Sequence, residues 1–239
     1  MQPILARAPM SRRTPGFLAS ALAIARKDLL IELRSRSVIL SALAFAVLAI
    51  TIFFFAWDPT QVASIDLAPG VLWVIFTFSG LLGLHRSFGV EQPTRAMDAL
   101  LAAPVGREAI YLGKLIANLG FVIVVQAVSV PTVALLYNVP IGGYVWPLIG
   151  VVLLAAVGLV AVGTLFSSMA VSTRLAELLL PLLALPFFVP VILPAAQATA
   201  RLMSGRAVSE VSGYISILGA FDVVFLVVCT LLYPYTLEQ

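Results

Sequence analysis

A charged segment interrupts the middle of an otherwise apolar sequence, between His85 and Lys114. Apolar side chains alternate there with acidic and basic ones, a pattern typical of a protein–protein contact in which apolar anchors are surrounded by charge. We predict a short helix at about residues 94–103, with three apolar anchors and charges at its rim; an ordinary solvated loop is the alternative. The candidate interface residues are Glu91, Arg95, Met97, Asp98, Leu100, Leu101 and Pro104.

Two single residues outside this set also have side chains that could do chemistry. His85 is the only histidine, and imidazole binds haem iron; the alternative, which we favour, is a histidine at a helix end that contacts a neighbour. Asp222 lies inside an apolar run, and an acid within a membrane helix is a candidate functional residue, with a purely structural role as the alternative.

The composition places this chain among membrane proteins. Of its 239 residues, 62% are hydrophobic and only 10% are charged, whereas soluble domains carry about 25% charged residues. One cysteine and one histidine exclude an internal disulfide and a multi-histidine metal centre. The sequence has no GxxxxGK[ST] phosphate loop for ATP and no basis for a Ser–His–Asp set, so we expect a chain that is not an enzyme. We also expect no nucleic-acid partner.

Six uncharged or nearly uncharged runs are long enough to cross a hydrocarbon core of about 30 Å. We therefore predict an all-α membrane protein with one six-helix transmembrane domain, residues 38–237. In the fifth span, four prolines predict a kinked helix, with short re-entrant or surface helices from its outer end through Gly213. The predicted spans are residues 38–57, 67–84, 115–138, 144–171, 178–198 and 213–235.

The region before the first span divides into two parts. Residues 1–15 are basic and contain prolines, which is typical of a mobile tail. Residues 16–36 have leucines at helical spacing on one side and charges on the other, which predicts an amphipathic helix in the interface plane. A twin-arginine export signal around Arg12 and Arg13 is the alternative, and it is disfavoured because its cleavage would leave the following basic cluster outside.

The distribution of basic residues predicts the orientation in the membrane. Six spans put both termini on one side, and a cytoplasmic amino end places the loop 86–108 and twelve of the 14 basic residues in the cytoplasm. Only Arg201 and Arg206 then lie outside. The twelve are Arg7, Arg12, Arg13, Arg26, Lys27, Arg34, Arg36, Arg86, Arg95, Arg107, Lys114 and Arg174.

Six stretches form a distinctive combination: residues 68–74 (APGVLWV), 84–88 (LHRSF), 97–104 (MDALLAAP), 113–115 (GKL), 181–191 (PLLALPFFVPV) and 214–220 (YISILGA). They resemble the haem exporter protein B (CcmB) family of permeases of cytochrome c maturation. The resemblance covers roughly residues 27–238, and a looser likeness at Lys27-Asp28-Leu29 extends to other ABC-type export permeases. His85 and Asp222 depart from the family pattern, which often has glutamate and an aliphatic residue there.

The resemblance implies a permease of the ABC-2-type exporter plan in the bacterial cytoplasmic (inner) membrane. It implies a homodimer on a dimeric CcmA-like ATPase, which would bind ATP-Mg and receive the segment around Met97, Leu100 and Leu101 as a coupling helix. It further implies the membrane proteins C and D of cytochrome c maturation and the haem chaperone E as partners, with haem as cargo or ATP-driven release of the haem-loaded chaperone. This chain itself would hold no cofactor. A general ABC exporter for a lipid, glycan or drug and a non-transporting membrane scaffold remain as alternatives.

Overall fold

The computed structural model describes residues 16–89, 105–140, 142–170 and 176–236, without the side chains of residues 85–89, 170 and 176–181. Within these ranges all regular secondary structure is helical, so the predicted all-α fold class is confirmed there. The helices are α1 (Phe17–Ser35), α2 (Ser37–Ala56), α3 (Ser64–Gly89), α5 (Arg107–Leu136), α6 (Val145–Ala170), α7 (Ala176–Met203) and α8 (Val208–Thr236).

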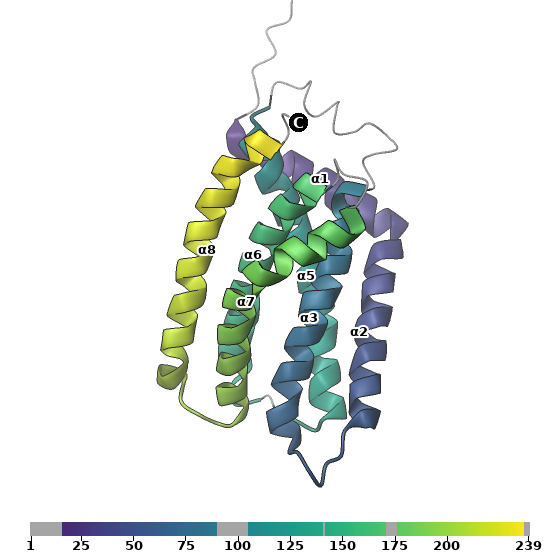
Figure 1. The fold of residues 1–239 in the computed structure, drawn as a ribbon, viewed down its shortest axis with the longest axis vertical. Coiled ribbons are helices and arrows are strands. Elements are labelled where there is room, and N and C mark those ends of the chain that lie inside the picture. The colour runs from purple at the N-terminus through teal and green to yellow at the C-terminus, as the bar shows by residue number, and fades with distance from the viewer. Residues whose placement is uncertain (1–15, 90–104, 141, 171–175, 237–239) are drawn as a thin grey trace, which may run out of the picture.

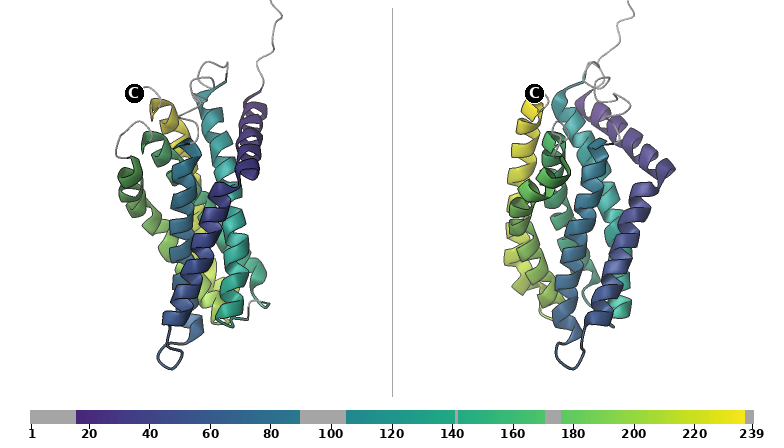
Figure 2. Two further views of the ribbon diagram at one scale, coloured as in Figure 1. Left: turned by 90° about the vertical axis from the view of Figure 1, so that its right-hand side faces the viewer. Right: turned by 45° about the vertical axis from the view of Figure 1, so that its right-hand side comes forward.

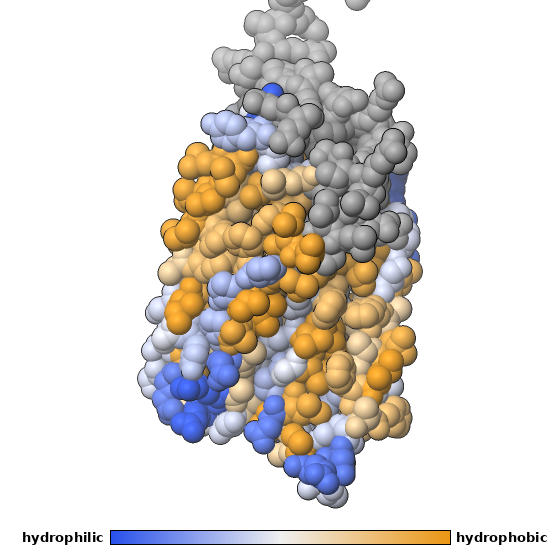
Figure 3. All heavy atoms as spheres, in the orientation of Figure 1, coloured by the Kyte–Doolittle hydropathy of each residue, from blue (hydrophilic) through white to orange (hydrophobic). Residues whose placement is uncertain are grey.

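Six of these helices, α2, α3, α5, α6, α7 and α8, are long and apolar enough to cross a membrane. They run up and down in one bundle (Figure 1), with α1 and the last turn of α8 at the same end, here called the α1 end. The opposite end carries the α2–α3 and α7–α8 connections and is called the hairpin end. Figure 3 shows a broad apolar surface along the bundle and hydrophilic residues gathered at the hairpin end, as a chain that spans a bilayer requires.

The seventh helix, α1, is inclined to the bundle and meets α2 at an angle (Figure 2). Arg36 makes this bend with a left-handed backbone, φ 53°, and its N–H donates to the carbonyl oxygen of Glu32. The Glu32 side chain also accepts a hydrogen bond from the N–H of Ile39, at 3.1 Å. A carboxylate at the first turn of α2 satisfies a free backbone donor and suits the positive end of the helix dipole.

The side of α1 that packs on the bundle differs from its leucine-rich side. Ser20, Ala21, Ile24 and Ala25 are buried, and a Cβ added to Gly113 of α5 would lie 2.7 Å from Ile24 Cβ and 2.8 Å from the Ala21 carbonyl oxygen. Small residues therefore let α1 and α5 approach closely. Four leucines of α1 stay exposed, as expected of side chains that contact lipid: Leu18, Leu22, Leu30 and Leu33.

One buried apolar cluster runs through all seven described helices. Lipid tails are as apolar as leucine, so helices in a membrane associate through close packing and hydrogen bonds. One such bond joins α3 to α7: the indole N–H of buried Trp73 donates to Thr199 Oγ1 at 3.0 Å, and that hydroxyl donates to the Ala195 carbonyl oxygen. On the outside, Leu48 of α2 and Leu231 of α8 stay more than 60% exposed, as lipid-facing side chains do.

The prediction of short helices between the fifth and sixth spans is wrong. α7 is one helix from Ala176 to Met203, despite its prolines, and α8 begins at Val208, five residues before the predicted Gly213. Only a tight connection at residues 204–207 separates them, with Gly205 at φ 73°. Neighbouring helices accommodate the prolines, as membrane bundles allow. The amino-terminal part of α7 crosses the bundle obliquely before the helix bends and runs along it (Figure 1).

Candidate functional site

All seven predicted interface residues lie outside the described part of the chain. Glu91, Arg95, Met97, Asp98, Leu100, Leu101 and Pro104 all fall between residues 90 and 104, and the side chain of His85 is also outside the description. Their roles stay predictions. The structure does describe the two helices that flank this segment, α3 up to Gly89 and α5 from Arg107, and it describes Asp222.

The start of α5 differs from the sequence-based prediction, which began the third span at Leu115. The helix begins eight residues earlier, at Arg107, with Gly106 as its N-cap. Arg107 and Lys114, predicted as residues of the charged loop, therefore belong to the first turns of a membrane-length helix. This segment carries four polar residues on one face, at spacings of four, three and four: Arg107, Tyr111, Lys114 and Asn118. We call these four residues the α5 hub.

Lys114 joins the hub to α1. Its side chain is completely buried, and Nζ lies 3.5 Å from Asp28 Oδ2, whose side chain is 15% exposed. The other oxygen of Asp28 pairs with Lys27 Nζ at 3.0 Å. Since charges are rarely buried in a membrane bundle without partners, this pair fixes the position of α1 against α5.

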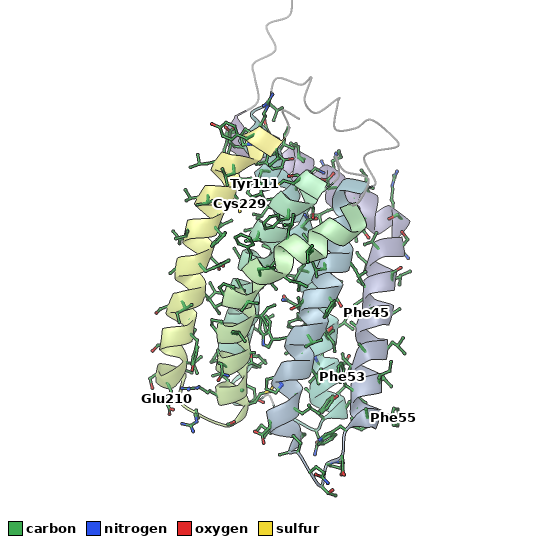
Figure 4. All side chains as sticks on the ribbon, in the orientation of Figure 1. Phe45, Phe53, Phe55, Tyr111, Glu210 and Cys229 are labelled. Atoms are coloured by element: carbon green, nitrogen blue, oxygen red, sulfur yellow. The ribbon has the colours of Figure 1, made fainter. Side chains whose placement is uncertain are left out.

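Two other hub residues contact neighbouring helices: Arg107 contacts the last turns of α8, and Tyr111 contacts α6 and α8. Arg107 Nη1 donates to the carbonyl oxygen of Pro234 at 3.2 Å. The buried Tyr111 hydroxyl donates to the Ala161 carbonyl oxygen at 2.9 Å, and its ring lies 5.3 Å from the ring of Tyr233. In Figure 4, Tyr111 and Cys229 of α8 lie next to each other near the α1 end.

Asn118 completes the hub. Its Nδ2 donates to Thr164 Oγ1 of α6 at 3.0 Å, and both residues are buried. A polar contact inside a bilayer favours one fixed arrangement because an unpaired amide is costly there. The four hub residues thus connect α5 to α1, α6 and α8 by polar contacts along its first three turns, so a displacement of this end of α5 must move or break contacts with three other helices.

Sequence reasoning named the charged residues of this region but missed the hub. Lys114 ends the charged central segment, just before an uncharged run, so the sequence places it in the loop, and it places Asp28 on the charged side of α1. The available signal was the helical spacing of Tyr111, Lys114 and Asn118, which places a lysine on the same face as two residues that favour burial when hydrogen-bonded.

Asp222 is the other predicted site residue that the structure describes. It is 5% exposed, and neither carboxyl oxygen has a hydrogen-bond partner among the described residues. It faces α6 at Gly158, where an added Cβ would lie 2.7 Å from Asp222 Oδ1. The adjacent rings of Phe221 and Phe225 stack with centroids 4.1 Å apart. Asp222 and the hub are therefore separate polar sites.

The described residues offer no constellation for metal chemistry: no three His, Cys, Asp or Glu side chains gather there as ligands. A bundle of six membrane-length helices, with a seventh helix held against one end by a buried ion pair, defines a polytopic α-helical membrane protein. Comparison with known families then identifies the group to which it belongs.

The chain belongs to the CcmB protein family, whose family model matches residues 19–239. Heme exporter protein B of Rhodobacter capsulatus is 29% identical over 78% of this chain and 85% of that protein. The protein of the same name from Paracoccus denitrificans is 33% identical over 69% of this chain and 75% of that protein. The one from Haemophilus influenzae is 28% identical, over 84% and 90%. The resemblance stated from the sequence motifs is thereby confirmed.

Proposed function

We propose that this chain is the membrane subunit of an ABC complex in cytochrome c maturation. It would couple ATP hydrolysis by a partner ATPase to haem export or to release of a haem-loaded periplasmic chaperone. The relatives named Heme exporter protein B support the haem-linked role. The observation that carries the coupling role is the α5 hub, because it lies at the start of the helix that follows the charged central segment and contacts three other helices.

In this proposal the central segment receives the ATPase. Met97, Leu100 and Leu101 would enter a groove on the ATPase, and Arg95 and Asp98 would lie at its rim. Glu91 and Pro104 would fix the two ends of the contact. The ATPase, a CcmA-like dimer, would bind ATP-Mg, and this chain would be a non-catalytic partner that forms a homodimer.

The α1 end of the bundle would face the cytoplasm of a bacterium. Among the described residues, this end carries the basic residues of α1 and the α5 hub, and the hairpin end carries Arg201 and Arg206. The bias toward one end supports a cytoplasmic location for it and for both termini in the inner membrane. The membrane proteins C and D would then contact the chain within the membrane, and the chaperone E would approach it from the periplasmic side.

The apolar core of the bundle distinguishes between the two alternative functions, a membrane scaffold and a general exporter. The described helices surround one continuous apolar core, which favours movement of α5 and its neighbours as a packed unit over a cargo path through the chain itself. A haem path would then lie at a boundary with another subunit. This observation keeps the scaffold function as a second candidate, and it gives no support to a wide polar conduit for a lipid, glycan or drug.

Co-purification with the ATPase tests the proposal. Leu100→Asp should abolish capture of the ATPase and ATP-dependent release of the haem-loaded chaperone, because it puts a charge on an apolar anchor. The matched control is Val62→Asp, which makes the same change at an exposed apolar residue of the hairpin end. Normal c-type cytochromes in a deletion strain, together with no ATPase captured by the unaltered chain, would refute the proposed function.

A further inference from the structure

Asp222 has no electrostatic partner at its depth in the bundle among the residues that the structure describes. No acidic or basic residue occurs in Val145–Ala170, the whole of α6. A Cβ added to Gly158, which Asp222 faces, would also lie 3.1 Å from Val191 Cγ2 of α7. Arg201 is ten residues from Val191 and Glu210 twelve from Asp222, which at 1.5 Å per residue places them about 15 and 18 Å away along their helices.

The charged and titratable groups nearest in sequence have other contacts. Arg201 lies over the ring of Tyr214, at 4.9 Å from its centroid, and Glu210 pairs with Arg206 at 3.1 Å. In the other direction, Cys229 lies two helical turns beyond Asp222, beside Tyr111 at the α1 end (Figure 4). Helix α5 also packs on α8, and its cations Arg107 and Lys114 contact the Pro234 carbonyl oxygen and Asp28. Among the described residues, therefore, no cation faces the Asp222 carboxyl from α6, α7 or α8.

The hydrogen-bonding groups around Asp222 suit a protonated acid. An ionised carboxylate is an acceptor only, and the N–H groups inside a helix are already bonded to carbonyl oxygens. Carbonyl oxygens can still accept a second bond, and hydroxyl groups in this bundle use them: Thr230 Oγ1 donates to the Leu226 carbonyl at 2.6 Å. The equivalent acceptor for Asp222, one turn earlier, is the Leu218 carbonyl, and only a carboxyl that carries a proton can donate to it.

We propose that Asp222 is a proton-binding site within the membrane and that its proton is linked to the contact between α6 and α8. The carboxyl is neutral while α8 packs on Gly158. It releases the proton when α8 moves away from α6 and water reaches the acid, and the negative charge then opposes return of the helix. Gly158 makes the site possible because any side chain there would occupy the position of the carboxyl. This inference does not depend on the ATPase or on haem.

Infrared spectroscopy of the chain in lipid nanodiscs tests the protonation state directly. The chain is labelled with carbon-13 at aspartate carboxyls, so that a neutral carboxylic acid gives a shifted C=O stretch distinct from the ionised aspartates. We expect this band at neutral pH in the unaltered chain and its loss in Asp222→Asn. Glu210→Gln, which removes an exposed acid of the same helix, should leave it unchanged. If the unaltered chain shows carboxylate bands at neutral pH and no neutral-acid band, the proposal is overturned, whatever the variants show.

A distance measurement tests the link to the helix contact. Spin labels at Leu153→Cys of α6 and Ile217→Cys of α8, both exposed, are placed in a Cys229→Ser background. The distance should lengthen at alkaline pH, over the same range in which the neutral-acid band disappears. Asp222→Asn should hold the short distance throughout. An equal lengthening in the Asn variant, or no change while the acid ionises, would overturn the linkage.

Discussion

The Nζ atom of Lys114 lies 3.5 Å from Asp28 Oδ2, although the lysine side chain is wholly buried and α1 and α5 are far apart in sequence. Asp28 also pairs with Lys27 and keeps some exposure to solvent. The two residues of this pair are therefore in unequal positions. A charge left in the interior has no access to water, whereas a charge left at Asp28 keeps both solvent and Lys27.

This inequality predicts unequal costs of substitution. Asp28→Asn should lower the free energy of unfolding by up to about 3–5 kcal/mol, the cost when one partner of a buried ion pair is removed. Lys114→Met should cost less, because the apolar side chain fits the interior and Asp28 retains Lys27. Thermal unfolding of the two purified variants in one detergent measures both. Equal losses, or a larger loss for Lys114→Met, would contradict the assignment of Lys114 as the buried partner.

Close packing of α1 on α5 gives a second prediction. Gly113→Ala should destabilise the chain by about 1–3 kcal/mol, since the added methyl would meet Ile24 and the Ala21 backbone. Gly150→Ala of α6 is the matched control: nothing lies within 4 Å of its added Cβ, and alanine in a helix gains up to about 1 kcal/mol over glycine. Unfolding midpoints that fall for Gly113→Ala and hold or rise for Gly150→Ala are expected. The reverse order would show that α1 does not pack closely on α5.

The cap of α2 gives a third prediction. Glu32→Ala removes the side-chain acceptor of the Ile39 N–H and should cost about 1 kcal/mol, as the loss of a helix cap does. Hydrogen exchange at the Ile39 amide should speed up in Glu32→Ala and much less in Glu32→Gln, which keeps an acceptor oxygen. Unchanged exchange in both variants would mean that Glu32 does not cap α2.

A fourth prediction concerns pH at the hairpin end. The side-chain and backbone hydrogen bonds from Thr60 hold the pKa of exposed Asp58 below its usual value. A carboxyl whose pKa is lower in the folded state stabilises the fold above its unfolded pKa, and that contribution is lost as the pH falls through its folded pKa. Carbon NMR titration should therefore show a higher pKa for Asp58 in Thr60→Val, and an unchanged pKa would contradict the assigned hydrogen bonds.

The six spans could be predicted from the sequence because each carries a long run of apolar residues, and hydrocarbon imposes that requirement on every crossing segment. The start of α5 could not be predicted in the same way. Lys114 is a charged residue, and its pairing with Asp28 of a distant helix offsets part of the cost of its burial. The hydropathy of a segment depends only on the residues within it, so it cannot indicate a pairing between residues on different helices.

The prolines of α7 were correctly predicted to bend the helix (Figure 1), but the short helices predicted beyond its outer end are absent from the described residues. A proline breaks an isolated helix, but in a bundle neighbouring groups satisfy the freed carbonyl oxygens, so α7 continues to Met203. Asp222 could be recognised as unusual from its apolar surroundings in the sequence. Its position against Gly158 could not, because that contact joins α8 to α6 across 64 residues.

Cross-linking to the ATPase tests the coupling role most directly. Cys229 is the only cysteine, so Cys229→Ser provides a background in which Leu100→Cys or Arg206→Cys is the single reactive thiol. With a short bifunctional maleimide and the assembled complex in native membranes, Leu100→Cys should cross-link to the ATPase and Arg206→Cys, at the hairpin end, should not. A cross-link from Arg206→Cys with none from Leu100→Cys would place the ATPase on the other face of the membrane and contradict the account.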